Sequence, residues 1–156
     1  MKFKKNQNTA TKLDTSSYTD ELFGIKKRIA VSHFSKRTDL VPEIDTNYVF
    51  DEATTLSIIM GFKYNKRVLV QGLHGTGKSS HIEQIAARLN WPCLRINLDG
   101  HISRFDLLGK DAIILKEEKQ ITTFKQGLLP WSIENPVALV FDEYDAGRPD
   151  VMFVIQ

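Results

Sequence analysis

The sequence is poor in cysteine, in long apolar runs and in charge of one sign, and each absence excludes a class of protein. Its 156 residues contain one cysteine, Cys93, which excludes a disulfide within the chain and argues against a thiolate metal cluster. No apolar run approaches the roughly 20 residues that cross a bilayer, and Met1–Lys5 leads into polar residues instead of a signal core. The formal net charge of +2 comes from interspersed acidic and basic residues, so no basic face favours nucleic-acid binding. We therefore expect a cytoplasmic protein that binds neither membrane nor nucleic acid.

Composition divides the chain into three segments. Residues 1–21 are rich in Lys, Asn, Thr and Ser and have few apolar groups, so we expect a flexible polar arm. Residues 22–50 supply enough apolar side chains for a small docking segment that could pack on a neighbour. Regular patterns begin at Asp51, which can cap a predicted helix, and continue to residue 156, which indicates that the folded core starts there.

The predicted elements of this core follow the order strand, glycine-rich loop, helix, strand. Arg67–Gln71 is a short apolar run typical of a strand buried in a parallel sheet, and Ser79–Asn90 has the pattern of an amphipathic helix. Cys93–Leu98 is the next predicted strand, which completes a βαβ unit. A β-hairpin is predicted over Ala112–Phe124 and a third apolar strand over Val137–Phe141. The predicted fold class is therefore α/β with a parallel sheet.

A candidate phosphate loop lies between the first strand and the helix. It consists of Gly72, Leu73, His74, Gly75, Thr76, Gly77, Lys78, Ser79 and Ser80. The first eight residues match G-x-x-x-x-G-K-[ST] at every fixed position. Glycines allow a tight loop whose backbone N–H groups surround phosphate oxygens, and the following helix points its positive end at the same anion. We expect Lys78 to bind the β- and γ-phosphates of ATP and assist catalysis, and Ser79 to ligate Mg²⁺. The alternative, a glycine-rich turn that matches by chance, is weakened by the flanking strand and helix.

A second candidate site follows the third strand, where Val137–Phe141 ends at Asp142 and Glu143. The carboxyl ends of neighbouring strands in an open parallel sheet lie at one edge, so Asp142 is expected to reach the magnesium region. Asp142 is the predicted Mg²⁺ ligand, and Glu143 is the predicted catalytic residue that orients the attacking water. An acidic strand end without a ligand is the alternative, and only the pairing with the phosphate loop makes this motif strong.

The four histidines, His33, His74, His81 and His101, show no i,i+4 pair and no cysteine partner of the kind that binds a metal. We therefore predict structural or solvated roles for them. His74 is the exception, because it lies within the phosphate loop and could line the nucleotide site.

Three longer strings carry a resemblance to a known family: Gly72–Pro92, His101–Ala112 and Val137–Asp150. In these strings the chain closely resembles the small AAA+ ATPase subunit of aerobic cobaltochelatases (the CobS type), and the likeness runs from about Phe23 to the end. The resemblance implies a P-loop NTPase (AAA+) fold with a three-layer αβα core, a parallel sheet incomplete at the C-terminus and a β-hairpin insertion. Residues 51–156 are then the N-terminal part of the AAA+ ATPase core.

The resemblance also implies cofactors and partners. The cofactors are ATP and Mg²⁺, and the assembly is a homo-oligomeric ring, expected to be a hexamer. The implied partners are a von Willebrand A-type chelatase subunit and a large subunit that inserts Co²⁺ into hydrogenobyrinic acid a,c-diamide in cobalamin biosynthesis. The family lies near the MoxR-type AAA+ proteins, whose insertion resembles Asp106–Gly109 with the predicted hairpin, which implies a partner-contacting element.

Other functions stay open at this point. They are a MoxR-like remodelling ATPase for another metalloenzyme, a nucleotide-binding module without hydrolysis and, more weakly, a small-molecule kinase. Members of the family continue past the Asp-Glu motif into further strands, a sensor asparagine, an arginine finger and a helical lid. We therefore expect a C-terminal truncation at Gln156, with two strand edges left unpaired and with poor stability and feeble ATP hydrolysis by the chain alone.

Overall fold

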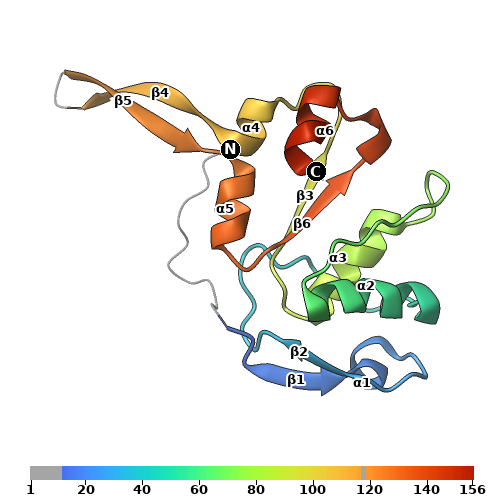
Figure 1. The fold of residues 1–156 in the computed structure, drawn as a ribbon. Helices are drawn as coiled ribbons and strands as arrows, with labels where there is room; N and C mark the ends of the chain where they lie inside the picture. Colours follow the sequence, from blue (N-terminus) through green and yellow to red (C-terminus); the bar gives the residue numbers. More distant parts are fainter. Residues whose placement is uncertain (1–11, 117–118) are drawn as a thin grey trace. The chain divides into compact units, whose positions relative to one another are not determined.

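The computed structural model describes residues 12–116 and 119–156 (Figure 1). Its helices are α1 (Thr19–Phe23), α2 (Glu52–Tyr64), α3 (Lys78–Arg88), α4 (Arg104–Leu108), α5 (Leu128–Glu134) and α6 (Pro149–Ile155), with a 3₁₀ turn at Tyr144–Ala146. Its strands are β1 (Thr15–Tyr18), β2 (Ala30–His33), β3 (Cys93–Asn97), β4 (Gly109–Lys116), β5 (Lys119–Gln126) and β6 (Ala138–Asp142). None of the helices in the described part is long and apolar enough to cross a bilayer.

The described residues form two compact units. Residues 12–94 with 136–140 make up the first, which contains the phosphate loop and is called the loop unit below. The second contains residues 95–116, 119–135 and 141–156, and is called the hairpin unit. The predicted division of the chain at residues 21 and 50 stays a prediction.

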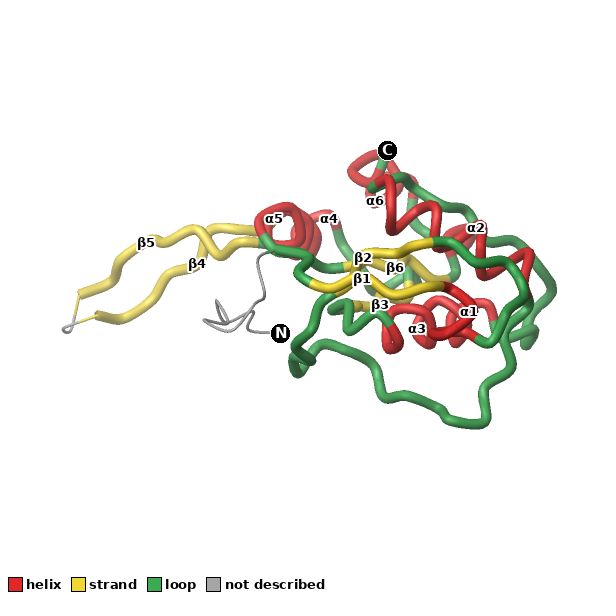
Figure 2. Tube along the Cα trace, turned by 90° about the horizontal axis from the view of Figure 1, so that it is seen from below, coloured by secondary structure: helices red, strands yellow, loops and turns green. Residues whose placement is uncertain are grey.

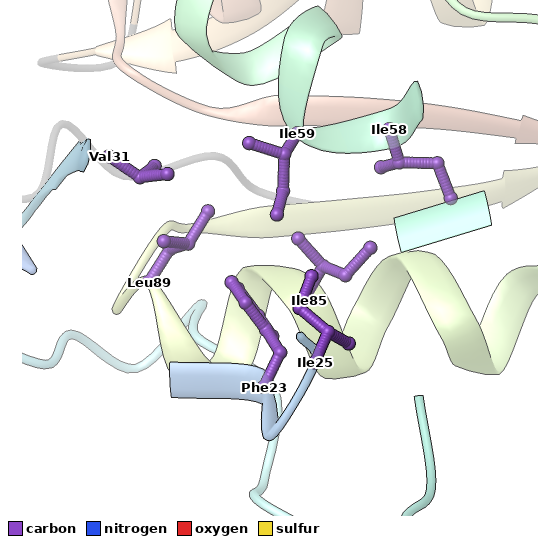
Figure 3. Close-up of a cluster of buried hydrophobic side chains, with 7 residues drawn as sticks. All are labelled: Phe23, Ile25, Val31, Ile58, Ile59, Ile85 and Leu89. Carbon is purple, nitrogen blue, oxygen red and sulfur yellow. The ribbon is translucent and has the colours of Figure 1, made fainter. Parts of the chain in front are cut away.

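The core of the loop unit is formed by α2, α3 and the segment that precedes α2 (Figure 3). Its buried side chains are Phe23, Ile25, Val31, Ile58, Ile59, Ile85 and Leu89. Ile59, Ile85 and Leu89 are fully buried. Full burial of one such side chain is worth about 1.5–3 kcal/mol, so this cluster holds α3 firmly against α2. Because α3 begins at the phosphate loop, the core also fixes where that loop starts its turn.

The segment before α2 contains a strand from Thr15 to Tyr18, within the residues 1–21 for which a flexible polar arm is predicted. β1 pairs with β2 in antiparallel fashion, with Thr15 opposite His33 and Tyr18 opposite Ala30. Backbone pairing satisfies the N–H and C=O groups of this polar stretch, which composition alone does not reveal. Residues 1–11 lie outside the described residues. Phe23, in the predicted docking segment over residues 22–50, is part of the core of its own unit.

α2 begins where the sequence predicts, because Asp51 caps it. The Asp51 carboxylate accepts the N–H of Thr54 at 2.9 Å. Hydrogen bonds from Thr54 also lower the pKa of Asp51. Near the other end of α2, a Cβ at Gly61 would collide with the Val68 side chain. A glycine is therefore needed for the chain to turn back along the helix.

Residues 67–71 belong to no sheet, which corrects the predicted first strand. The described sheets pair β1 with β2, β3 with β6, and β4 with β5. Val68 and Leu69 are 44% and 70% exposed, whereas Val70 packs against the core. A strand exists only beside a neighbour that takes up its backbone hydrogen bonds. The apolar composition that led to the prediction indicates a tendency to be buried, but it does not indicate that the segment pairs with another strand.

β3 and β6 form a parallel pair. At one end Ala138 N–H donates to the C=O of Pro92 at 2.8 Å, and at the other Leu98 N–H donates to the C=O of Asp142 at 2.9 Å. The residue numbers rise together along both strands, so the strands run in the same direction. This pair confirms the predicted α/β class with a parallel sheet.

β4 and β5 form a long antiparallel hairpin that extends beyond α4 and α5 (Figure 2). Its register places Gly109 opposite Gln126 and Lys116 opposite Lys119. The hairpin predicted over Ala112–Phe124 is therefore confirmed and is longer at its base. Residues 117 and 118, which follow β4 and precede β5 in the sequence, lie outside the described residues.

Candidate nucleotide-binding site

The candidate phosphate loop lies directly before α3, as predicted. Gly75 and Gly77 have φ angles of 78° and 80°, in the left-handed region that favours glycine. A Cβ at either position would meet nothing within 4 Å, so the requirement for glycine is conformational and not spatial. The C=O of Gly77 accepts the N–H of His81 at 2.8 Å, which starts the helix. These two glycines let the chain turn sharply into a helix N-terminus, where an anion is favoured.

Lys78 closes the loop on itself. Its Nζ donates to the C=O of Gly72 at 2.9 Å and to the C=O of Leu73 at 2.7 Å. The hydroxyl of Thr76 donates to the C=O of Leu73 at 2.8 Å. The ammonium group is thus held beside the first two loop residues, close to the start of α3. A fixed cation at a helix N-terminus suits the phosphates of a nucleotide.

The remaining loop residues differ in exposure. His74 and Ser80 are exposed, whereas Ser79 is half-buried in the first turn of α3. The first backbone N–H groups of a helix have no partner within the helix, so a phosphate at this position would find donors there. The roles of Ser79 as a Mg²⁺ ligand and of His74 and Ser80 beside the nucleotide stay predictions.

His81 ties α3 to α2 and to the segment before α2. His81 is 7% exposed, with its ring Nδ1 2.8 Å from the Tyr48 hydroxyl and Nε2 3.0 Å from the Thr55 hydroxyl. The Phe50 ring packs against it edge to face. Burial lowers the pKa of His81, and the Asp51 carboxylate opposes that shift. A buried ring with both nitrogens engaged has the structural role that the sequence predicts for this histidine.

The end of β6 carries the second candidate site. Asp142 Oδ2 accepts from Arg95 Nε at 2.8 Å and from Arg95 Nη2 at 2.5 Å. Asp142 Oδ1 accepts the N–H of Glu143 at 3.1 Å. The prediction from sequence did not include Arg95, although a charged residue within the otherwise largely apolar strand Cys93–Asn97 was a signal. The predicted magnesium ligand is therefore paired with a cation in this structure.

Glu143 occupies an unusual backbone conformation. Its φ and ψ are 51° and 44°, in the left-handed region, and its side chain is exposed. The C=O of Glu143 accepts the N–H of Ala146 at 2.9 Å in the 3₁₀ turn that follows. A residue with a Cβ pays roughly 1–2 kcal/mol in this conformation, and such strain is common at functional turns. Glu143 thus lies outside β6, at the point where the 3₁₀ turn begins.

The predicted ATP and Mg²⁺ residues fall in both units. Residues 72–80 belong to the loop unit, and Asp142 and Glu143 belong to the hairpin unit. In the loop unit the predicted residues lie together in one loop and the first turn of α3, and in the hairpin unit Asp142 and Glu143 lie together at the end of β6. A serine hydroxyl and an aspartate carboxylate are oxygen donors of the kind that Mg²⁺ prefers, so both sets fit that ion chemically. The joining of both sets into one site stays a prediction.

Cys93 offers no additional chemistry. Burial, with a smaller effect from the Glu83 carboxylate, raises the pKa of its thiol to about 12. The thiol is therefore protonated at neutral pH, and a thiol is neither a strong nucleophile nor a good metal ligand.

Comparison with known proteins gives a family and several relatives. The family described as AAA domain (dynein-related subfamily) matches residues 67–155. The aerobic cobaltochelatase subunit CobS of Sinorhizobium is 61% identical over 143 residues, which cover 92% of this chain and 43% of that protein. An uncharacterised protein of Staphylococcus haemolyticus is 27% identical over 108 residues, 69% of this chain and 39% of that protein. This chain thus spans less than half the length of these relatives. No solved structure matches.

Proposed function

Because the chain belongs to the AAA family, we propose that it binds ATP with Mg²⁺ and serves as the ATPase subunit of an aerobic cobaltochelatase. The observation that carries nucleotide binding is the closed loop before α3, in which Lys78 bonds to the carbonyls of Gly72 and Leu73. The 61% identity to the CobS subunit of Sinorhizobium supports the assignment to a chelatase.

The proposed roles follow the chemistry of each group. Backbone N–H groups of residues 72–80 would bind the phosphates, and Lys78 would leave its loop carbonyls to reach the β- and γ-phosphates. Ser79 and Asp142 would hold Mg²⁺, which when bound neutralises charge on the phosphates. Glu143 would orient the attacking water through its exposed carboxylate.

The larger setting rests on the family resemblance. We propose that ATP hydrolysis in a homo-oligomeric ring, a hexamer, drives insertion of Co²⁺ into hydrogenobyrinic acid a,c-diamide. The cobalt and the tetrapyrrole are substrates that would be held by the large chelatase subunit, and a von Willebrand A-type subunit would be a further partner. The hairpin of β4 and β5 is the proposed contact with a second chelatase subunit.

One face of this hairpin favours such a contact. The register places Ile113, Leu115 and Phe124 on the same face of the hairpin. Side chains alternate between the two faces along a strand, so Ile113 and Leu115 share the face of Gly109. Phe124 shares the face of Gln126, which is the residue opposite Gly109. These three side chains are 71%, 76% and 62% exposed. An exposed apolar patch rimmed by polar residues is typical of a protein interface.

The experiment that tests this function measures ATP binding and ATP hydrolysis separately in the intact protein. Glu143→Gln is expected to keep nucleotide affinity while hydrolysis falls by roughly 10²–10⁴-fold, since only the group that orients water is lost. Lys78→Ala is expected to lose both, and Lys66→Ala, at an exposed lysine outside the loop, serves as the matched control. Nucleotide binding without any hydrolysis by the unmodified protein would instead support a binding module. Hydrolysis that survives in Glu143→Gln would remove Glu143 from its proposed role.

A further inference from the structure

Arg95 makes an interaction that the nucleotide-binding motifs do not account for. Its Nε and Nη2 both donate to a single oxygen, Oδ2 of Asp142, at 2.8 and 2.5 Å. The other oxygen, Oδ1, accepts the N–H of Glu143. The cation that Asp142 holds in this structure is therefore a guanidinium group from the neighbouring strand.

We propose that Arg95 is the built-in counter-ion of Asp142 in the metal-free protein and that it competes with Mg²⁺ for this carboxylate. The inference rests on the proposed function, in which Asp142 ligates Mg²⁺. The inference adds Arg95 as a residue that raises the Mg²⁺ concentration needed to fill the site. Arg95 acts here through Asp142 and is not itself assigned a catalytic step.

The exposures of the two side chains fit an exchange of cations. The Asp142 side chain is 20% exposed, so its carboxylate is partly desolvated and is more favourable with a cation beside it than alone. The Arg95 side chain is 46% exposed, so its guanidinium has a route into solvent when it is released. Each interaction of Asp142 with Mg²⁺ therefore replaces an existing ion pair instead of filling an empty position.

This competition ties magnesium binding to nucleotide binding. Without phosphates, Mg²⁺ gains one carboxylate and must displace Arg95 from it. With ATP present, phosphate oxygens and Ser79 add ligands, and the exchange becomes favourable. Arg95 thus disfavours metal binding by the nucleotide-free site.

The test is a Mg²⁺ titration of fluorescent mant-ATP binding by the intact protein. In Arg95→Ala the Mg²⁺ concentration for half-maximal binding is expected to fall roughly two- to five-fold, the size typical of a partly exposed ion pair. The shift is expected to be larger at low ionic strength, because salt screens such pairs. Arg95→Gln, which keeps most of the side-chain volume without the charge, is expected to shift in the same direction. Arg104→Ala, at an exposed arginine of the hairpin unit, is the matched control and is expected to behave as the unmodified protein.

Two further results separate the inference from the proposed function. Asp142→Asn is expected to raise the Mg²⁺ requirement, and if it does not, the assignment of Asp142 as a ligand fails together with the inference. If Asp142→Asn raises the requirement while Arg95→Ala and Arg95→Gln leave it unchanged or raise it, only the competition is overturned. A raised requirement in both Arg95 variants would mean that Arg95 orients Asp142 for the metal. Circular dichroism identifies any variant that does not fold, and Arg95→Gln carries the test if Arg95→Ala is lost in this way.

Discussion

The core of the loop unit and the β4–β5 hairpin use their apolar residues in opposite ways. In the loop unit Ile59 and Ile85 are fully buried, between the helices that support the phosphate loop. In the hairpin unit Ile113, Leu115 and Phe124 are 71%, 76% and 62% exposed on β4 and β5. The first arrangement stabilises the packing of α3 on α2, whereas the second leaves apolar surface exposed on β4 and β5.

The phosphate-loop half and the carboxylate half of the candidate site also differ in how firmly their side chains are held. Lys78 is anchored by two backbone carbonyls, on a helix whose inner face is buried. Asp142 and Glu143 depend on a partly exposed ion pair and on a left-handed backbone turn. Lys78 is therefore held by backbone groups of its own loop, whereas Asp142 depends on a partly exposed ion pair, an interaction that typically contributes little to stability.

The largest expected effect contrasts one isoleucine from each unit. Ile85→Ala leaves a cavity in the core and is expected to lower the free energy of unfolding by about 2–5 kcal/mol. Ile133→Ala removes a side chain that is 84% exposed, and its effect is expected to stay within about 0.5 kcal/mol. Urea denaturation of both variants measures the difference. Equal losses in the two variants would contradict the contrast between the buried core and the exposed apolar surface.

A smaller effect of opposite sign is expected at the strained turn. Asparagine tolerates the left-handed region better than glutamate does, so Glu143→Asn is expected to raise the free energy of unfolding by about 0.5–1 kcal/mol while hydrolysis is lost. Glu143→Gln removes the same charge but keeps the strain, and it serves as the control. Thermal denaturation of the two variants side by side measures the gain. If both variants have the same melting temperature, the backbone strain at residue 143 does not affect stability.

His81 makes the stability of the loop unit depend on pH. Burial lowers its pKa in the folded protein, so the unfolded chain takes up the proton more readily. The contribution of neutral, buried His81 to the free energy of unfolding is therefore complete above the unfolded pKa of about 6.5. It is lost as pH falls from there towards the pKa of His81 in the folded protein. His81→Gln is expected to flatten the dependence of the melting temperature on pH below about 6.5, whereas His101→Gln, at an exposed site, leaves it unchanged. An identical slope in His81→Gln would assign the pH dependence to other groups.

The smallest effect on stability is expected at the hairpin. Ile113→Ser and Leu115→Ser change exposed side chains, so the free energy of unfolding is expected to shift by no more than about 0.5 kcal/mol. Association with the partner subunits is expected to weaken in the same variants, which analytical ultracentrifugation of the mixed subunits measures. Thr122→Ala, on the same face of the hairpin, is a control for a change without loss of apolar surface. Unchanged association in both serine variants would place the contact elsewhere.

Much of the local structure was predictable from short-range patterns. Asp51 caps α2 as predicted, and the helix after the loop begins at the lysine of the motif. The absence of a strand at residues 67–71 was not predictable in the same way, since strand pairing depends on a neighbour that lies far away in sequence. The pairing of β1 with β2 was missed for the same reason, because the backbone bonds that order Thr15–Tyr18 leave no apolar pattern.

The candidate site shows the same limit. The glycines, Lys78 and Ser79 could be identified because their chemistry demands fixed spacing along the chain. Arg95 could not be assigned to Asp142, because the two residues are 47 positions apart and meet only when β3 and β6 pair.

By itself, the sequence determined that this chain has a phosphate-loop motif, an acidic strand end and a hairpin, since each is specified by residues close together in the chain. The tertiary structure decided that residues 67–71 belong to no sheet, that His81 is buried between Tyr48 and Thr55, and that Asp142 is paired with Arg95. These features depend on contacts between distant residues, and burial and pairing of that kind are settled only when the chain folds.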